Sequence, residues 1–318
     1  MRGNIKRQLG GSPTTIGEET HLPHAVEGDL TTTVRVIGWL ITGMLLAALV
    51  AGLWRGFTSH RGLVLNLVNG LETSEVGFAI ILILLGSIVE GFGYGLSLGT
   101  RWPYTRNIVV LMARGDPEAA HRLVATLVGL VALALVILSP NVTTISGLSL
   151  IVVTALFGMG TLYVLAGRAP AFVHGTHGLL AYGVFLVYLT SLVYPGLSFW
   201  TYLGAIGALH ALLLAVFLGG MTTGQRGFGT AIEPFVRPRK GSQWTIVAHV
   251  SAALLLVATL GWMMPAYPVA FFLAVTQVAV GFLLFHAVNL KPKDPGILVA
   301  FHQFMVLLMC LAIVLRWR

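Results

Sequence analysis

Four histidines occupy matching places in the two halves of this chain. His121 and His177 lie 56 residues apart, and His249 and His302 lie 53 residues apart. Each lies a few residues inside a strongly apolar segment, where an imidazole needs partners for its ring nitrogens. Paired histidines on facing helices can hold a haem iron between them as axial ligands. The pattern therefore predicts two similar haem sites, with these four histidines as the metal ligands.

The other histidines fit this repeat less well. A single histidine inside a membrane is equally well explained by a hydrogen bond between helices. His210 and His286 have no histidine counterpart in the other half of the chain. His174 lies one turn from His177, so it is an alternative ligand or a contact for a haem propionate.

Basic residues accompany the four histidines. Haem carries two propionates, and Arg is a favoured partner for carboxylates. The arginines that we expect to bind the cofactor in this way are Arg101, Arg122 and Arg237. Each of these arginines is equally well explained as a charge that sets the orientation of the chain in the membrane.

Glu118 distinguishes the first half from the second. It lies three residues before His121, on the same helix face, and Ile246 takes its place in the second half. A structural interpretation is available, because Asp116 as N-cap and Pro117 at the first helical position make Glu118 part of a favourable helix start. The functional interpretation is a carboxylate beside one haem only, which moves protons or stabilises a developing cation. Glu118 is therefore the candidate catalytic residue.

The composition shows which elements position these residues. The chain has 318 residues, of which 56% are hydrophobic and only 9% are charged, against roughly 25% charged residues in a soluble domain. Nine apolar segments are each long enough to cross a hydrocarbon core of about 30 Å as a helix. They cover residues 33–54, 75–97, 119–138, 146–166, 171–193, 200–220, 244–263, 268–288 and 296–316. The chain is thus predicted to be an all-α integral membrane protein with nine transmembrane helices.

An internal duplication organises the nine segments. A glycine-rich passage ends the second and the sixth segment, and each passage leads through a proline-containing loop to a histidine. We therefore expect two pseudo-repeated four-helix bundles, at residues 75–195 and 196–318. The segment 33–54 has no counterpart and is predicted to be an appended N-terminal helix, which follows a polar tail over residues 1–32.

The duplication also places the histidines in depth. They open the second and fourth helix of each bundle, so all four lie near one membrane face. Two to seven residues inside a helix start correspond to a depth of roughly 3–10 Å. Glu90 lies inside the second segment and needs a partner, for which Arg101 or Arg122 is available.

Several function classes are excluded. The net charge of +8 is scattered over short loops and forms no dense basic patch, so no nucleic-acid partner is expected. The single cysteine, Cys310, permits neither an intrachain disulfide nor a CxxC site.

From about residue 75 to its end, the chain resembles the haem A synthase family. The resemblance rests on Trp102-Pro103 after a glycine-rich turn, Glu118-Ala-Ala-His121-Arg122, Gly158…Pro170…His177-Gly-Leu-Leu-Ala, and Gln277-Val-Ala-Val-Gly281…His302-Gln303. It implies that the first histidine pair binds the substrate haem O and that the second pair binds a b-type haem. It also implies that Glu118 is needed to oxidise a ring methyl group to a formyl group, which yields haem A. Many members carry a cysteine pair in the first loop, where this chain has none.

The expected function is therefore a haem A synthase-like oxidation, with the second bis-histidine haem b serving electron transfer. The alternative is a non-catalytic b-type cytochrome subunit of a membrane respiratory oxidoreductase complex. A non-haem transporter that uses histidines for protons or metal is a third, weaker interpretation. Expected partners are membrane lipid and either respiratory subunits or a second copy of the chain. The expected location is a bacterial or archaeal cell membrane, with the mitochondrial inner membrane as the alternative.

Overall fold

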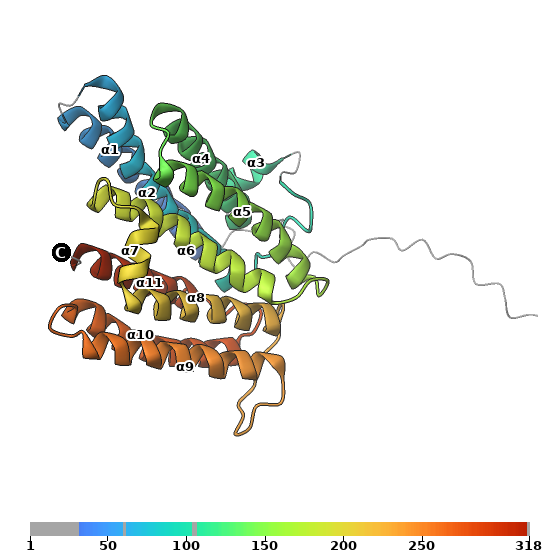
Figure 1. Cartoon of the computed structure of the whole chain (residues 1–318). Helices are drawn as coiled ribbons and strands as arrows, with labels where there is room; N and C mark the ends of the chain where they lie inside the picture. The colour runs from blue at the N-terminus through green and yellow to red at the C-terminus, as the bar shows by residue number, and fades with distance from the viewer. Residues whose placement is uncertain (1–31, 60–61, 104–106, 317–318) are drawn as a thin grey trace, which may run out of the picture.

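The structure, a computed structural model, describes residues 32–59, 62–103 and 107–316. This part of the chain folds into eleven helices and contains no strand (Figure 1). The helices are α1 (Thr32–Thr58), α2 (Leu63–Gly91), α3 (Ile108–Ala113), α4 (Pro117–Leu138), α5 (Val142–Leu165), α6 (Phe172–Val193), α7 (Phe199–Ala205), α8 (Gly207–Arg226), α9 (Gly241–Trp262), α10 (Pro268–Leu290) and α11 (Leu298–Arg316). Nine of these helices are long and apolar enough to span a membrane, which confirms the predicted class. The predicted tail, apart from residue 32, lies outside the described residues.

The second predicted segment, 75–97, is shifted relative to the helix that forms. α2 begins at Leu63, and its first three turns carry polar side chains such as Asn66 and Asn69 that lower the hydropathy there. It ends at Gly91 because the chain then turns, with Gly93 at a φ of +72°. Such a left-handed conformation favours glycine. Residues 92–103 therefore form a loop of successive turns.

The predicted segment 200–220 is divided into two helices. Ser198 begins α7 by accepting a hydrogen bond from the Trp200 N–H at 3.2 Å. At Ile206 the backbone is extended, with φ −113° and ψ 94°, and this breaks the helix before α8 starts. The short helix α3, which packs on α4, was not predicted either.

The long helices lie side by side in two groups (Figure 1). One group contains α2, α4, α5 and α6, and the other contains α8, α9, α10 and α11. The groups meet where α6 packs on α8 and α2 packs on α11. A single hydrophobic core runs through this contact and includes Phe185 and Tyr188 from the first group, and Leu212 and Ile313 from the second.

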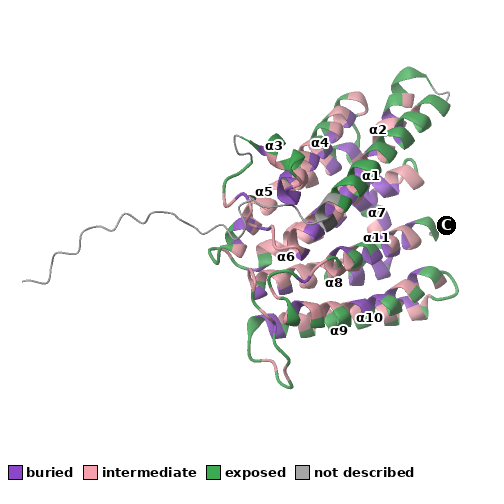
Figure 2. Ribbon diagram, turned by 180° about the vertical axis from the view of Figure 1, so that it is seen from behind, coloured by how far each residue is buried: buried purple, intermediate pink, exposed green. Residues whose placement is uncertain are grey.

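α1 lies outside both groups and packs against α2. Its contact is made by small residues, because a Cβ atom added to Gly52 would stand 2.6 Å from the Gly70 carbonyl oxygen, and one added to Gly56 would stand 3.0 Å from the Asn66 carbonyl oxygen. This Gly-x-x-x-Gly spacing brings two helix backbones close together inside a membrane. Between Val36 and Thr58 most other residues of α1 are exposed, as expected for a helix that faces lipid (Figure 2).

The four helices that carry the histidine pairs, α4, α6, α9 and α11, begin at the same end of the molecule, here called the histidine end (Figure 1). His121, His177 and His302 lie four or five residues after the first residue of their helices, whereas His249 lies eight residues after Gly241. The predicted common depth is therefore right for three of them, and His249 lies about one turn deeper along its helix.

Candidate functional site

The environment of His121 is built by α2 and α4. Asp116 caps α4 by accepting from the Ala119 N–H at 2.9 Å, which fixes the helix start one turn before the histidine. The Nδ1 atom of His121 lies 3.2 Å from the Leu82 carbonyl oxygen of α2. Its Cε1 atom lies 3.2 Å from the position that a Cβ atom on Gly86 would occupy. The imidazole thus packs directly on a glycine that lies four residues after its hydrogen-bond partner.

The same arrangement recurs at two further histidines. His177 Nδ1 lies 3.0 Å from the Thr154 carbonyl oxygen, and its Cε1 lies 3.0 Å from a Cβ position on Gly158. For His249 the corresponding distances are 2.8 Å to the Ala215 carbonyl oxygen and 3.2 Å to a Cβ position on Gly219. In each case the glycine again follows the carbonyl residue by four positions.

His302 keeps this spacing with a different partner. Its Cε1 lies 3.5 Å from a Cβ position on Gly281. The residue four positions earlier, Gln277, uses its side chain, with Nε2 2.9 Å from His302 Nδ1 and 2.9 Å from the His302 carbonyl oxygen. Gln277 Oε1 is buried with no partner among the described residues. The amide nitrogen that contacts Nδ1 also donates to the His302 carbonyl oxygen, so the partner of Nδ1 in His302 differs in kind from the backbone carbonyls of the other three histidines.

These contacts determine which ring nitrogen is free. A backbone carbonyl can only accept, so in three of the histidines Nδ1 carries the proton and donates it. The Nε2 atom then keeps its lone pair, as in histidines that bind metals. Three of the four histidines therefore present one imidazole geometry, which a set of unrelated helix–helix hydrogen bonds would not require.

The second pair has the separation that axial ligation needs. The ring centroids of His249 and His302 lie 6.3 Å apart, with their planes inclined at 57°. Two metal–nitrogen bonds of about 2 Å each place the centroids of two coordinated imidazoles roughly 6 Å apart. His121 and His177 interact electrostatically across α4 and α6. In both pairs the histidines come from facing helices, as predicted.

The described residues contain no group of three or more His, Cys, Asp or Glu side chains that could hold a metal ion alone. Haem iron takes four ligands from the porphyrin and needs only two from the protein. Two histidines per site therefore fit haem better than they fit a zinc site, which uses three or four protein ligands.

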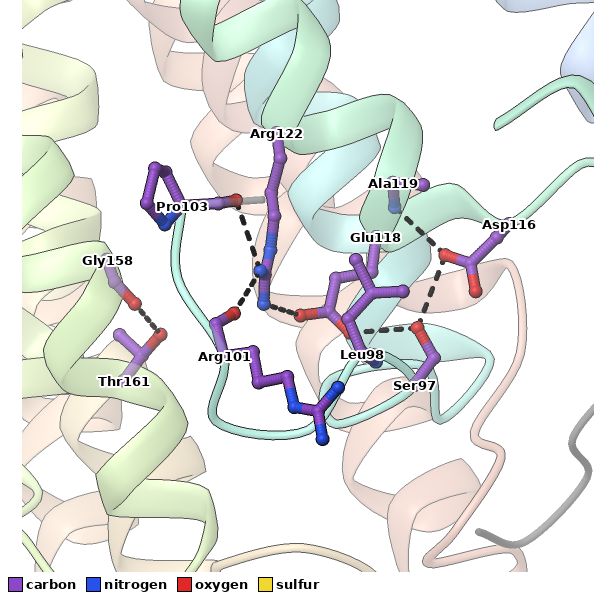
Figure 3. A network of polar contacts seen from close by, with 10 residues as sticks. All are labelled: Ser97, Leu98, Arg101, Pro103, Asp116, Glu118, Ala119, Arg122, Gly158 and Thr161. Carbon is purple, nitrogen blue, oxygen red and sulfur yellow. Dashed lines mark hydrogen bonds and ion pairs between the residues drawn. The ribbon is translucent and has the colours of Figure 1, made fainter. Parts of the chain in front are cut away.

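Glu118 is held by several donors at the start of α4 (Figure 3). Its Oε1 forms an ion pair with Arg122 Nη2 at 2.5 Å. Its Oε2 accepts from the Ser97 hydroxyl at 2.8 Å and from the Leu98 N–H at 3.0 Å. The side chain is buried, so both oxygens are engaged in contacts within the protein. Its partners Ser97 and Leu98 were not predicted, because nothing in the local sequence links them to a residue twenty positions away.

Arg122 completes this cluster instead of pointing at the histidines. Its Nη1 donates to the carbonyl oxygens of Arg101 at 2.5 Å and Pro103 at 3.3 Å. The Glu118–Arg122 pair thus fastens the loop 92–103 to the beginning of α4. The side chain of Arg101 is exposed and extends away from the pair (Figure 3). Arg237 is also exposed, in the loop between α8 and α9.

Glu90 has a different partner from the two that we expected. Its Oε1 pairs with Nη2 of Arg226 on α8 at 2.9 Å, not with Arg101 or Arg122. Arg226 also donates to the carbonyl oxygens of Thr230 at 3.1 Å and Pro292 at 2.6 Å. The pair therefore ties the two bundles together near the histidine end. The prediction was wrong because the packing of α8 on α6 brings Arg226, far away in sequence, within reach of Glu90 at the end of α2.

His174 lies on α6, three residues before His177. Its Nδ1 is buried without a hydrogen-bond partner in the described part of the chain. It interacts electrostatically with His177 and Arg226. Unlike the four paired histidines, it has no hydrogen-bond partner at Nδ1 among the described residues, so its geometry does not match theirs.

Tyr94 adds to the polar character of the loop that follows α2. Burial raises the pKa of the Tyr94 hydroxyl, and the nearby carboxylates of Asp116 and Asp294 raise it further. The phenol therefore remains protonated at neutral pH and adds no charge beside the Glu118–Arg122 pair.

Comparisons of the chain with protein-family models, with curated proteins and with solved structures found no match.

Proposed function

We propose that this protein holds two haems inside the membrane, one between His121 and His177 and one between His249 and His302. The observation that carries the proposal is the repeated imidazole setting, with Nδ1 at a hydrogen-bond partner and Cε1 on a glycine four residues later. The 6.3 Å separation of the His249 and His302 rings supports it. Bound haem would supply the redox chemistry at both places.

We further propose that the first bundle converts haem O to haem A, in the manner of the haem A synthases. Oxidation of a ring methyl to a formyl group, with water as the oxygen source, releases four electrons and four protons. The second pair would hold a b-type haem through which the electrons leave, to an acceptor outside the chain. We assign the oxidation to the first bundle because only this bundle has a carboxylate, Glu118, at this position. Its counterpart in the second bundle is Ile246.

In this proposal the chain's own residues have distinct roles. The histidines orient the cofactors through fixed Nδ1 contacts. The Glu118–Arg122 pair keeps the loop 92–103 closed over the start of α4 and excludes water there. Glu118 is also the carboxylate nearest in sequence to His121, and it would accept a proton that the oxidation releases.

The second candidate is an electron-carrying cytochrome subunit of a respiratory complex that leaves its haems unchanged. One observation favours it, since both oxygens of Glu118 are engaged in fastening the loop. The proposed location for either function is a respiratory membrane, either a prokaryotic cell membrane or the mitochondrial inner membrane.

Expression together with a source of haem O, followed by chromatography of the extracted haems, tests both candidates. Haem A in the extract supports the synthase. Two haems B per chain without haem A, together with co-purifying respiratory subunits, support the cytochrome. Protein without a Soret absorption band would contradict both. His249→Ala and His302→Ala should each remove the b-type spectrum of the second bundle, and an intact spectrum in both variants would refute that ligand pair.

A further inference from the structure

The first bundle contains a buried carboxyl group that the histidine pairs do not use. Glu75 lies near the middle of α2 with none of its surface exposed, and neither oxygen has a partner within the described part of the chain. The hydroxyls of Tyr188 and Thr190 on α6 are also buried without partners there. Tyr188 lies within electrostatic range of Glu75. An ionised carboxylate in such a setting is costly, so this group requires a proton.

A polar cavity lies at the other end of the molecule from the histidines, here called the opposite end. It has a volume of about 430 Å³ and is lined by the ends of α1 and α6, the start of α2 and the loop between α4 and α5. Glu72, one turn before Glu75, lines it and accepts from the Ser191 hydroxyl at 3.1 Å. Arg55 lines it too and interacts electrostatically with Glu72. Glu72 therefore stands between the cavity and Glu75.

The spacing along α2 links Glu75 to the histidine site. Leu82, whose carbonyl contacts His121, lies seven residues after Glu75, and Gly86 lies eleven residues after it. Both intervals are close to whole numbers of helical turns, so the three residues share one helix face. Seven residues span roughly 10 Å along the axis. Glu75 thus lies on the His121 side of α2, between the cavity and the histidine.

The second bundle lacks this feature. When the two glycines that face histidines on α2 and α8 are aligned, Ala208 stands at the place of Glu75. When the histidines of α6 and α11 are aligned, Ile313 stands at the place of Tyr188. The polar residues are therefore no general requirement of this bundle architecture, since the second copy is built without them.

We propose that Glu72 and Glu75 form a proton pathway from the opposite end into the first bundle, in which Glu75 binds and releases a proton. The charged or titratable groups that face the two carboxyls are Arg55 of α1 and Tyr188 of α6. The neighbouring helices α4 and α11 contribute apolar side chains to the adjoining core, such as Leu135 and Ile313.

A proton fits this site better than a metal cation does. Calcium and magnesium require about six oxygen ligands, and the described residues contain no group of three or more His, Cys, Asp or Glu side chains that could hold a metal ion. Arg55 already supplies a positive charge at the cavity and repels a second one. The pathway does not depend on which haem the histidines bind.

Infrared spectroscopy of the full-length protein in lipid vesicles tests the pathway. The carbonyl band of a protonated carboxylic acid is recorded in H2O and during exchange into D2O. We expect a band at neutral pH that Glu75→Gln removes and that Glu233→Gln, a change at an exposed carboxylate, preserves. Ser191→Leu, which fills the cavity, and Glu72→Gln should each keep the band and slow its deuterium shift by about tenfold, the effect of losing one ordinary hydrogen-bonded step.

A second measurement does not require the Glu75→Gln variant to fold. A hydrophobic carbodiimide modifies protonated carboxyl groups, and mass spectrometry of the treated wild-type protein should find the modification at Glu75. Three results would overturn the pathway: no modification and no protonated band, an exchange rate that neither Ser191→Leu nor Glu72→Gln changes, or a band that sodium or calcium ions displace at constant pH. The last result would assign the site to a metal cation.

Discussion

Each paired histidine packs on a glycine of a neighbouring helix, and at His121, His177 and His249 this contact is too close to accept a side chain without a shift of the ring. At His249 a Cβ atom on Gly219 would already approach Cε1 to 3.2 Å and Nδ1 to 3.3 Å. The glycine and the hydrogen-bond partner of Nδ1 together orient the ring. The glycine that helps to orient each ring therefore lies on a different helix from the histidine.

Gly219→Leu should displace His249 and empty the second site alone. A pyridine haemochrome assay should then find about one haem fewer per chain than in the wild type. Gly204→Leu is the matched control, because nothing lies within 4 Å of a Cβ atom at that glycine. An unchanged haem content in Gly219→Leu would show that the ring contact does not control binding.

Glu118→Gln should separate the structural role of Glu118 from a catalytic one. Glutamine keeps the size of the side chain but leaves the buried Arg122 charge unpaired, which costs about 3 kcal/mol or more. The double variant Glu118→Gln/Arg122→Gln should recover part of this loss, as measured by thermal unfolding in detergent. The amount of haem A formed per bound haem is then compared between the two variants and the wild type. If Glu118 is catalytic, both variants should lose haem A production. Unchanged haem A production would leave Glu118 only a structural role.

The helices differ in what holds them in place. α2 is the central element, because it contacts α1, α4, α6 and α11 and carries Glu72, Glu75, Gly86 and Glu90. α1 touches the rest of the described chain chiefly through α2 and its small residues. An appended helix held in this way should be separable from the haem sites.

Gly52→Leu should release α1 from α2 without loss of haem, because the new side chain meets the backbone of Gly70 and the side chain of Ser74. Limited proteolysis between α1 and α2 should become faster. Gly43→Leu is the control on the same helix, since a Cβ atom there meets nothing within 4 Å. Equal cleavage rates in the two variants would contradict the proposed packing, and a loss of haem would show that α1 supports the first bundle.

The two bundles share one hydrophobic core, and the ion pair between Glu90 and Arg226 also connects them. Glu90 and Arg226 come from different bundles, and the Arg226 side chain is only 6% exposed. The hydroxyl of Tyr182 on α6 also donates to Gln303 Oε1 of α11 at 2.7 Å. The positions of the two histidine pairs relative to each other therefore depend on these contacts.

Arg226→Gln should destabilise the protein by about 3 kcal/mol, since it removes the partner of the Glu90 carboxylate, whose side chain is only 21% exposed. The double variant with Glu90→Gln should lose less, so thermal unfolding should reveal a large coupling between the two positions. Lys240 and Glu233 form an ion pair with both side chains more than half exposed, and the same cycle there should give about 0–1 kcal/mol. Similar couplings at both pairs would show that Glu90–Arg226 does not fasten the bundles.

The sequence by itself determined the membrane class and the repeated positions of the four histidines. Hydrophobic segments of about 20 residues and the spacing of histidines and glycines are local patterns, and a lipid environment permits few folds for them. The bounds of α2 and the break at Ile206 were not predicted. A hydropathy pattern does not detect a helical turn with polar side chains or a change in backbone conformation, and these decide where the two helices begin and end.

Only the tertiary structure decided which polar groups meet. It paired Glu90 with Arg226, engaged Glu118 with Ser97 and Leu98, and joined Glu72 to Ser191 at the cavity. Each of these contacts joins helices or loops that lie far apart in the sequence. Inside a membrane a polar side chain must find a partner or a proton, and the packing of the helices determines which groups come within reach.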